Sequence, residues 1–180
     1  MMTEQTTTNE TLEAWNRLEP QAAAATVLPC NGSLAWAVGL EKLRPFMSAE
    51  AVFEASDSVW LGLEASDWQD AFDSHPRIGE HKAKAATEQS LTWSSGEQSA
   101  AQLTEDTQAK LAAANRVYEE TFGRIFIVCA SGKSAAEMLE ILRKRLANDA
   151  ETELHEAAEQ QRQITQIRLR KWLQVPQEVK

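Results

Sequence analysis

Glycine and proline are scarce in this chain of 180 residues, which has seven glycines and five prolines. No proline lies between Pro76 and Pro176, and no glycine follows Gly132. Because both residues interrupt helices, their absence from the second half is typical of long helices. Alanine occurs 28 times and leucine 17 times, against 14 for valine and isoleucine together. The first pair favours helix and the second favours strand, so the composition predicts an all-α fold.

Basic residues are also few: 18 lysines and arginines stand against 27 acidic residues, for a formal charge of −9. This balance argues against nucleic acid and anionic membrane surfaces as partners, since both are bound by clustered positive charge. No apolar run approaches the roughly 18–20 residues of a membrane span. Residues 1–10 lack the basic and apolar parts of a secretory signal, which favours a cytoplasmic location.

Residues that bind metals are sparse and badly spaced. Cys30 and Cys129 lie far apart and match no metal-binding spacing, so we expect two reduced thiols. Of the three histidines, His75 and His81 are separated by five residues, which suits no common pair of helical ligands. The sequence therefore predicts no metal site.

The length is that of one domain, which we place over residues 11–174 after a flexible tail over 1–10. We expect a compact bundle of about eight or nine helices, including one over about 58–72 and a last one over about 150–173. Residues 28–33 have the composition of a turn. Ser134-x-x-Glu137 and Ser94-x-x-Glu97 are capping-box patterns that open helices. The apolar run 125–130 is too short for a typical core helix and is predicted as an extended buried segment.

His75 is the first candidate for chemistry. It lies at a predicted helix end and is followed by Pro76, which restricts its backbone. An imidazole can give or take a proton at neutral pH. The residues leave open the simpler interpretation, an exposed histidine of a loop.

For two further sites, a structural role and a functional role are both open. Glu97 and Gln98 lie at a predicted helix start, where Glu97 can cap the helix or can form part of a polar edge that binds a ligand. Arg168 falls within the apolar stripe of the last helix, about 40° from Leu154 around the axis. A buried guanidinium needs an anionic or polar partner, which is either an internal acidic residue or a bound substrate.

Several motifs occur together in one order along residues 12–173. They are His75-Pro76-Arg77-Ile78-Gly79, Glu97-Gln98, Phe122-Gly123 before the apolar run, Arg145-Leu146-Ala147-Asn148, and Ile164-Thr165-Gln166-Ile167-Arg168-Leu169. This combination resembles the family of OHCU decarboxylases, which act on 2-oxo-4-hydroxy-4-carboxy-5-ureidoimidazoline (OHCU). The segment around His75 and the downstream Ser-x-x-Glu-Gln are its most specific parts.

The resemblance implies a compact all-α fold and decarboxylation of OHCU to (S)-allantoin in urate degradation, without a cofactor. It assigns catalysis to His75 and places Glu97 at a position that contacts the substrate. We expect Glu97 to take part in catalysis by orienting the imidazole or the substrate hydroxyl. It assigns substrate contacts to Pro76, Ser94, Gln98, Phe126, Ile127, Val128, Cys129, Ala130 and Arg168. Ser95 remains an alternative to Ser94. The resemblance also implies a homodimer, with urate oxidase and hydroxyisourate hydrolase as neighbours in the pathway.

Two other functions compete with this one. The first is a helical interaction module without enzymatic activity, in which Arg168 forms a structural salt bridge away from His75. The second is a related enzyme that acts on a different ureido compound.

Overall fold

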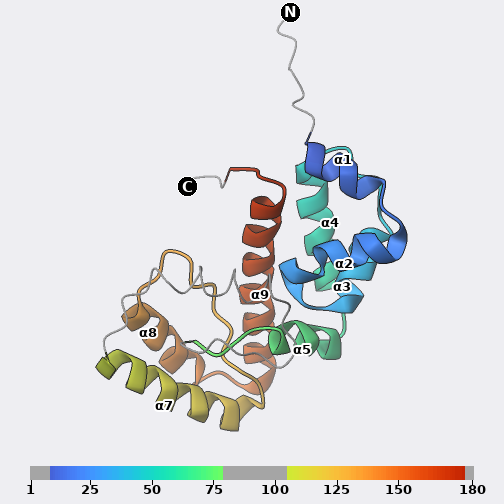
Figure 1. Cartoon of the computed structure of the whole chain (residues 1–180). Coiled ribbons are helices and arrows are strands. Elements are labelled where there is room, and N and C mark those ends of the chain that lie inside the picture. Colours follow the sequence, from blue (N-terminus) through green and yellow to red (C-terminus); the bar gives the residue numbers. More distant parts are fainter. Residues whose placement is uncertain (1–8, 79–104, 177–180) are drawn as a thin grey trace, which may run out of the picture.

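The structure is a computed structural model that describes residues 9–78 and 105–176. These residues form eight helices and no strand (Figure 1). The helices are α1 (Glu10–Asn16), α2 (Pro20–Asn31), α3 (Leu34–Glu41), α4 (Ala49–Leu61), α5 (Ala65–Asp73), α7 (Glu105–Phe122), α8 (Ala135–Arg145) and α9 (Ala150–Trp172). The predicted all-α fold is confirmed. In this part of the chain, no helix is both long and apolar enough to cross a lipid bilayer.

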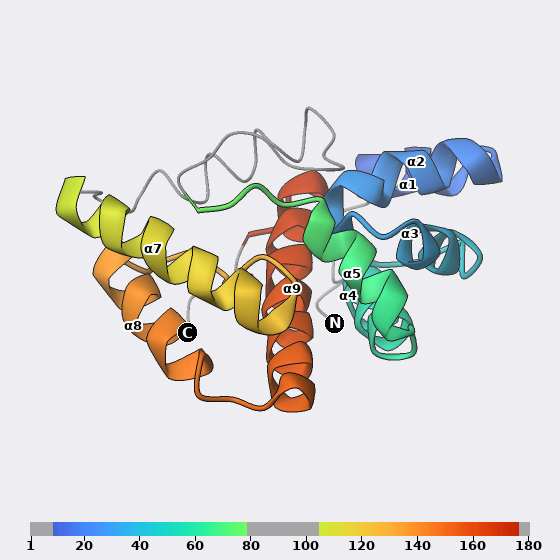
Figure 2. The ribbon, with the colours of Figure 1, turned by 90° about the horizontal axis from the view of Figure 1, so that it is seen from below.

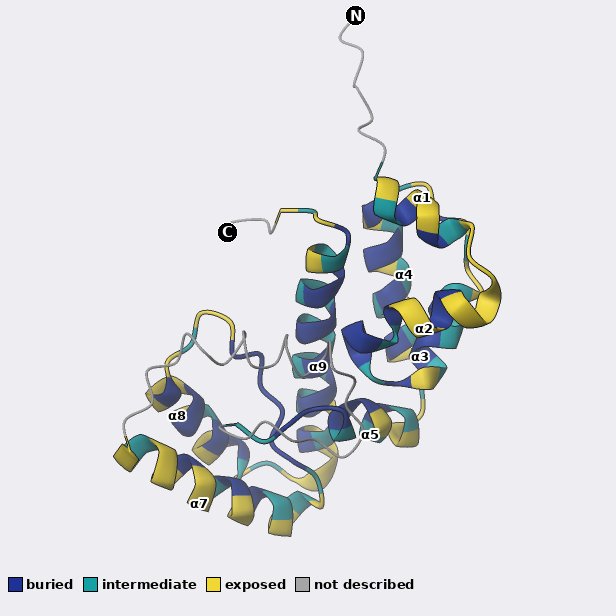
Figure 3. Cartoon of the chain, in the orientation of Figure 1, coloured by how far each residue is buried: buried dark blue, intermediate teal, exposed yellow. Residues whose placement is uncertain are grey.

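Helix α9 is the central element of the fold. Helices α1 to α5 lie on one side of it, and α7 and α8 lie on the other (Figures 1 and 2). The helix packs against α2, α4 and α5, while α7 packs mainly against α8. Most of α9 is buried or half-buried, whereas α7 exposes one face (Figure 3). Because α9 lies between the two groups, its side chains can contact segments that are distant in the sequence.

The apolar segment 125–130 separates two hydrophobic cores. Its odd-numbered residues belong to the core of α1 to α5 and α9, and its even-numbered residues belong to the core of α7 and α8. An alternation with period two is the geometry of extended chain. Both faces are buried, so the sequence is continuously apolar and not alternating. The predicted extended buried segment is confirmed.

The helix boundaries follow from local hydrogen bonds where a cap is present. Ser134 accepts a hydrogen bond from the backbone of Glu137, whose carboxylate accepts one from the Ser134 backbone. This is the predicted capping box of α8. Asp149 caps α9 in the same manner by accepting from the backbone of Thr152. Gly123, with φ of +69°, ends α7.

Two expected boundaries are wrong. Helix α2 continues through Pro29 to Asn31, and the turn expected over 28–33 is confined to Gly32 and Ser33. A proline near a helix end removes only one backbone donor, and here the helix continues past it. The single helix expected over 58–72 is two, because α4 ends at Leu61 and α5 begins at Ala65.

The apolar periodicity hides this second break because both helices contribute to the same core. Trp60 of α4 and Trp68 of α5 lie with ring centroids 5.9 Å apart, and the Trp68 indole donates to the Trp60 carbonyl. The start of α5 is marked instead by the Asp67 carboxylate, which accepts from the backbone of Glu64. A carboxylate at this position satisfies a donor that the helix leaves unpaired.

Candidate functional site

His75 lies directly after α5, on the segment that leads past α9 toward α7 (Figure 2). Its backbone N–H donates to the Phe72 carbonyl, which continues the last turn of the helix. Two residues later, Arg77 donates to both carboxylate oxygens of Glu119 on α7, at 2.5 and 2.8 Å. The segment is thus held at both ends. The His75 side chain is only 8% exposed, so the alternative of an exposed loop histidine is wrong.

The imidazole of His75 contacts α9 through a glutamine. Its Nε2 lies 2.7 Å from Oε1 of Gln161, which is fully buried. Burial and, to a lesser extent, the Arg168 charge lower the pKa of His75 to about 3, against the opposing effect of the hydrogen bond with Gln161. Both main causes disfavour the imidazolium. The side chain is therefore a neutral imidazole at pH 7.

Arg168, two turns beyond Gln161 on α9, is also fully buried, as the periodicity predicted. Among its contacts, its guanidinium donates to the carbonyl of Pro29 at 3.3 Å. That carbonyl belongs to the last turn of α2, whose final carbonyl groups have no partner within the helix. The C-terminal end of a helix carries partial negative charge, which favours a cation there. The end of α2 therefore helps to hold a buried positive charge.

Cys30 lies in the same last turn of α2 and is fully buried. Burial raises the pKa of its thiol to about 12, against the opposing effect of Arg168. A protonated thiol is a poor nucleophile, so this cysteine does not supply covalent chemistry at neutral pH.

The extended segment 126–130 reaches α9 from the other side. The backbone N–H of Cys129 donates to Oε1 of Gln160 at 2.9 Å, and Lys133 donates to the Cys129 carbonyl at 2.8 Å. Further back, Arg145 donates to the Ile127 carbonyl at 2.6 Å. These contacts fix the position of a backbone to which the family resemblance assigns substrate binding.

Helix α9 thus carries Arg168 and contacts two other predicted stretches, His75 with Pro76 through the Gln161 side chain and residues 126–130 through the Gln160 side chain. The predicted residues in these three stretches are all buried. Ser94, Glu97 and Gln98, together with the alternative Ser95, lie outside the described residues. The charge of Arg168 acts on His75, whereas the interaction-module hypothesis places these two side chains apart.

Sequence reasoning missed the polar groups that connect these stretches, namely Gln161, Thr165 and Asn31. A signal was present, because Gln161, Thr165 and Arg168 follow one another at spacings of four and three. At about 100° per residue, such positions share one face of a helix. A polar stripe therefore runs along the face of α9 that was singled out for Arg168 alone.

Gly32 ends α2 and lies against Ser74, the residue that precedes His75. Its φ of +101° lies in the left-handed region, which favours glycine. A Cβ atom at Gly32 would stand 2.2 Å from Oγ and 2.5 Å from Cβ of Ser74, the residue before His75. Ser74 is buried and donates to the Ala71 carbonyl at 2.6 Å, so it has little room to move. The turn at Gly32 and the His75 segment are thus in direct contact.

We expect Gly32→Ala to destabilise the protein more than Gly132→Ala does. Both glycines have positive φ, but no atom lies within 4 Å of a Cβ placed at Gly132. Conformational strain alone costs about 1–2 kcal/mol, and overpacking adds about 1–3 kcal/mol at Gly32. Urea denaturation of the two variants measures the difference. Equal free energies of unfolding would show that the Ser74 side chain can move away from the added Cβ atom without loss of stability.

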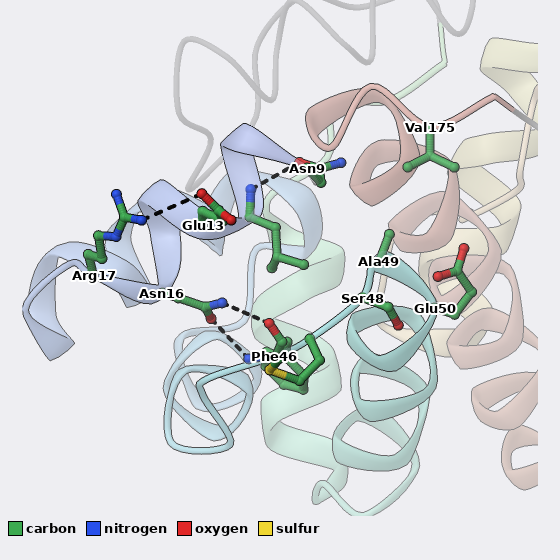
Figure 4. Close-up of a pocket in the computed structure, with 11 residues that line it drawn as sticks. Asn9, Glu13, Asn16, Arg17, Phe46, Ser48, Ala49, Glu50 and Val175 are labelled. Carbon is green, nitrogen blue, oxygen red and sulfur yellow. Dashed lines mark hydrogen bonds and ion pairs between the residues drawn. The ribbon is translucent and has the colours of Figure 1, made fainter. Parts of the chain in front are cut away.

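A separate pocket of about 590 Å³ lies where α1, the start of α4 and Val175 meet (Figure 4). Its polar groups are largely engaged with one another. The Asn16 side chain donates to the carbonyl of Phe46 and accepts from its N–H, and Arg17 pairs with Glu13. None of the predicted site residues that the structure describes lines it. Among the described residues, no group of three or more His, Cys, Asp or Glu could hold a metal ion.

Comparisons with known proteins identify the family of this chain. A family model for OHCU decarboxylase matches residues 16–170. The chain is 38% identical over 144 residues to the uric acid degradation bifunctional protein TTL of Arabidopsis thaliana, covering 79% of this chain and 44% of that protein. It is 27% identical over 133 residues to a uric acid degradation bifunctional protein of Bacillus sp. (strain TB-90), covering 72% and 25%. The chain spans less than half the length of both curated relatives.

The fold is shared with solved structures. A crystal structure of OHCU decarboxylase in the presence of (S)-allantoin superposes with a TM-score of 0.71 and 28% identity, covering 87% of this chain and 99% of that one. A crystal structure of (S)-allantoin synthase superposes with a TM-score of 0.67 and 16% identity, over 89% of this chain and 53% of that one. The second similarity concerns the fold alone.

Proposed function

Because this chain belongs to the OHCU decarboxylase family, we propose that it catalyses the decarboxylation of OHCU to (S)-allantoin in urate degradation. The observation that carries the proposal is a buried imidazole, His75, whose pKa is lowered by its burial and by the charge of a buried guanidinium, Arg168. This combination suits an anionic substrate whose reaction requires proton transfer in a site away from water.

The chemistry needs no electron sink beyond the substrate. The bond to the carboxylate breaks, and its electron pair moves into the adjacent C=N bond, whose nitrogen takes up a proton. The resulting enol becomes a ketone when its hydroxyl loses one proton and the ring carbon gains one. Overall, one proton is taken up and carbon dioxide is released. Protonation of the ring carbon on one face yields a single enantiomer.

We assign the proton transfer to His75 and the anchoring of the substrate to Arg168. A neutral imidazole can accept the hydroxyl proton and return it to the ring carbon. When an anionic substrate binds, its charge offsets that of Arg168 and raises the pKa of His75 toward the range needed for proton uptake. Burial and the Arg168 charge thus keep the imidazole neutral in the free site, and the charge of the bound substrate makes His75 a stronger base.

The other predicted residues take roles around these two. Pro76 and the backbone of Phe126 to Ala130 would line the substrate, with the amides of the extended segment holding the ureido and ring groups. Ser94, or Ser95 in its place, with Glu97 and Gln98 would complete the site, and Glu97 would orient the imidazole or the substrate hydroxyl. We further propose a cytoplasmic homodimer that follows urate oxidase and hydroxyisourate hydrolase in the pathway and uses neither metal nor cofactor.

A coupled assay tests the activity. Urate oxidase and hydroxyisourate hydrolase generate OHCU from urate in situ, and the optical rotation of the product is followed with and without this protein. We expect rapid formation of optically active (S)-allantoin. Racemic product that forms no faster than without the protein would contradict the proposal. Faster consumption of a different ureido compound would favour the related enzyme instead.

A further inference from the structure

The amide of Gln161 is held in one orientation by its neighbours. Its Nε2 donates to the carbonyl of Asn31 at 3.1 Å and lies 3.3 Å from Oγ1 of Thr165. The Asn31 carbonyl, at the end of α2, can only accept. A Gln161 amide turned by 180° would place its oxygen against that carbonyl and would lose both donations. The oxygen of the amide therefore faces His75.

Thr165 supports the same orientation. Its hydroxyl donates to the Gln161 backbone carbonyl at 2.9 Å, so the oxygen is left to accept. It accepts from the Asn31 side chain at 3.0 Å as well as from Gln161. Asn31 is in turn fixed because its own side-chain oxygen accepts from the backbone of Ser33. Each donor in this buried group meets an acceptor, which makes the arrangement self-consistent.

This orientation of the amide decides which group donates in the hydrogen bond between Gln161 and His75. An amide oxygen cannot donate, so at 2.7 Å the imidazole must donate from Nε2. In a neutral imidazole, the second nitrogen then carries the lone pair. Among the described residues, Nδ1 of His75 has no hydrogen-bond partner, and Gln161 is the partner of the ring through Nε2.

We propose that Gln161 is a positioning residue that holds His75 in the tautomer protonated at Nε2, so that Nδ1 is the atom that exchanges the proton with the substrate. The inference rests on the proposed function for the exchange, whereas the tautomer follows from the hydrogen bonds alone. An uncharged amide suits this role because it orients the ring, while its hydrogen bond favours the imidazolium less than burial and the Arg168 charge disfavour it. A carboxylate in its place would favour the charged ring.

Nitrogen-15 NMR of the intact protein tests the tautomer directly. The chain has three histidines, so a long-range proton–nitrogen correlation spectrum is small. The loss of one set of signals in His75→Gln assigns His75. At pH 7 we expect a protonated Nε2 and an unprotonated Nδ1 in the free protein. A protonated Nδ1, in either the other tautomer or the imidazolium, would overturn the inference.

Gln161→Met tests the positioning role, because it keeps the approximate shape and removes the acceptor. We expect kcat to fall about 100-fold, the scale of a misplaced catalytic group, with KM changed less than threefold. The His75 signals should shift toward the tautomer protonated at Nδ1 or a mixture. Gln163→Met is the matched control, since Gln163 lies on the same helix and bonds to Glu159. It should keep the parent kcat.

Gln161→Glu separates positioning from packing, since it retains an oxygen that can accept from Nε2. It should keep the Nε2 proton and, because a carboxylate favours the charged ring, raise the pKa of His75 above that of the parent, which a pH titration of the His75 signals measures. Equal activity of the parent and Gln161→Met, with unchanged His75 signals, would overturn the positioning role. An inactive parent that shows the Nε2 proton would contradict the proposed function and leave the tautomer in place, so the two failures are distinguishable.

Discussion

Replacing Glu153 by alanine is expected to destabilise the protein by about 3–5 kcal/mol, the usual cost of removing one partner from a buried ion pair. Glu153 is fully buried in the first turns of α9. Its Oε1 accepts from Nε and Nη2 of Arg145 at 2.9 and 2.5 Å, and also from the hydroxyl of Tyr118. Alanine would leave the Arg145 guanidinium in the interior without its counter-charge.

This ion pair connects the two halves of the fold. Arg145 belongs to α8, Tyr118 to α7 and Glu153 to α9, while Asn148 donates to Oε2 of Glu153 from the intervening turn. The Arg145 guanidinium also lies over the ring of Phe126, 4.7 Å from its centroid, and donates to the Ile127 carbonyl. Loss of Glu153 should therefore loosen the extended segment of the proposed site as well as the packing of α7 and α8.

Urea denaturation followed by tryptophan fluorescence measures the change, with the free energy obtained by linear extrapolation. Glu159→Ala is the matched control on the same helix. Glu159 forms a partly exposed pair with Arg162, and removing such a pair changes stability by at most about 1 kcal/mol. If Glu153→Ala and Glu159→Ala had the same midpoint, the buried pair would contribute no more than a surface pair does.

The sequence predicted those features that depend on local patterns. The capping box at Ser134, the end of α7 at Gly123 and the buried position of Arg168 follow from spacing along one helix. The extended segment could be inferred because an apolar run buried on both faces is too short for a core helix. In each case, the responsible residues lie within a few turns of one another.

What the sequence did not reveal depends on which elements meet. Glu153 is an acidic residue in the first turn of a helix, a common position on electrostatic grounds, so nothing indicated that it is buried. Gln161 resembles any polar residue of a helix until the end of α2 and the His75 segment meet α9 beside it. The contacts of Gln161 with His75 and Asn31 join residues more than 80 positions apart. Helical periodicity does not encode such pairings.

His75→Ala is expected to reduce turnover of OHCU by about 10²- to 10⁴-fold, the usual contribution of a positioned acid or base. The helical circular dichroism should be unchanged, because the side chain follows α5 and caps no helix. His155→Ala is the matched control. His155 is exposed on α9 and contacts the Glu151 carbonyl and the Trp68 ring. It should turn over like the parent, and equal turnover by His75→Ala and the parent would refute the assignment.

The same variant has a signature in stability that is independent of the substrate. The pKa of His75 is lowered from 6.5 to about 3 on folding, so between these values the unfolded chain binds more protons than the folded one. The free energy of unfolding of the parent therefore falls as the pH decreases from about 6.5 toward 3. His75→Ala lacks this contribution and should show a shallower fall, whereas above pH 7 the contribution vanishes. Two results together would show that the imidazole is buried and neutral: a loss of turnover at pH 7.5, and a free energy of unfolding that falls less steeply with decreasing pH than that of the parent. A surface histidine would not impose such a cost on stability in acid.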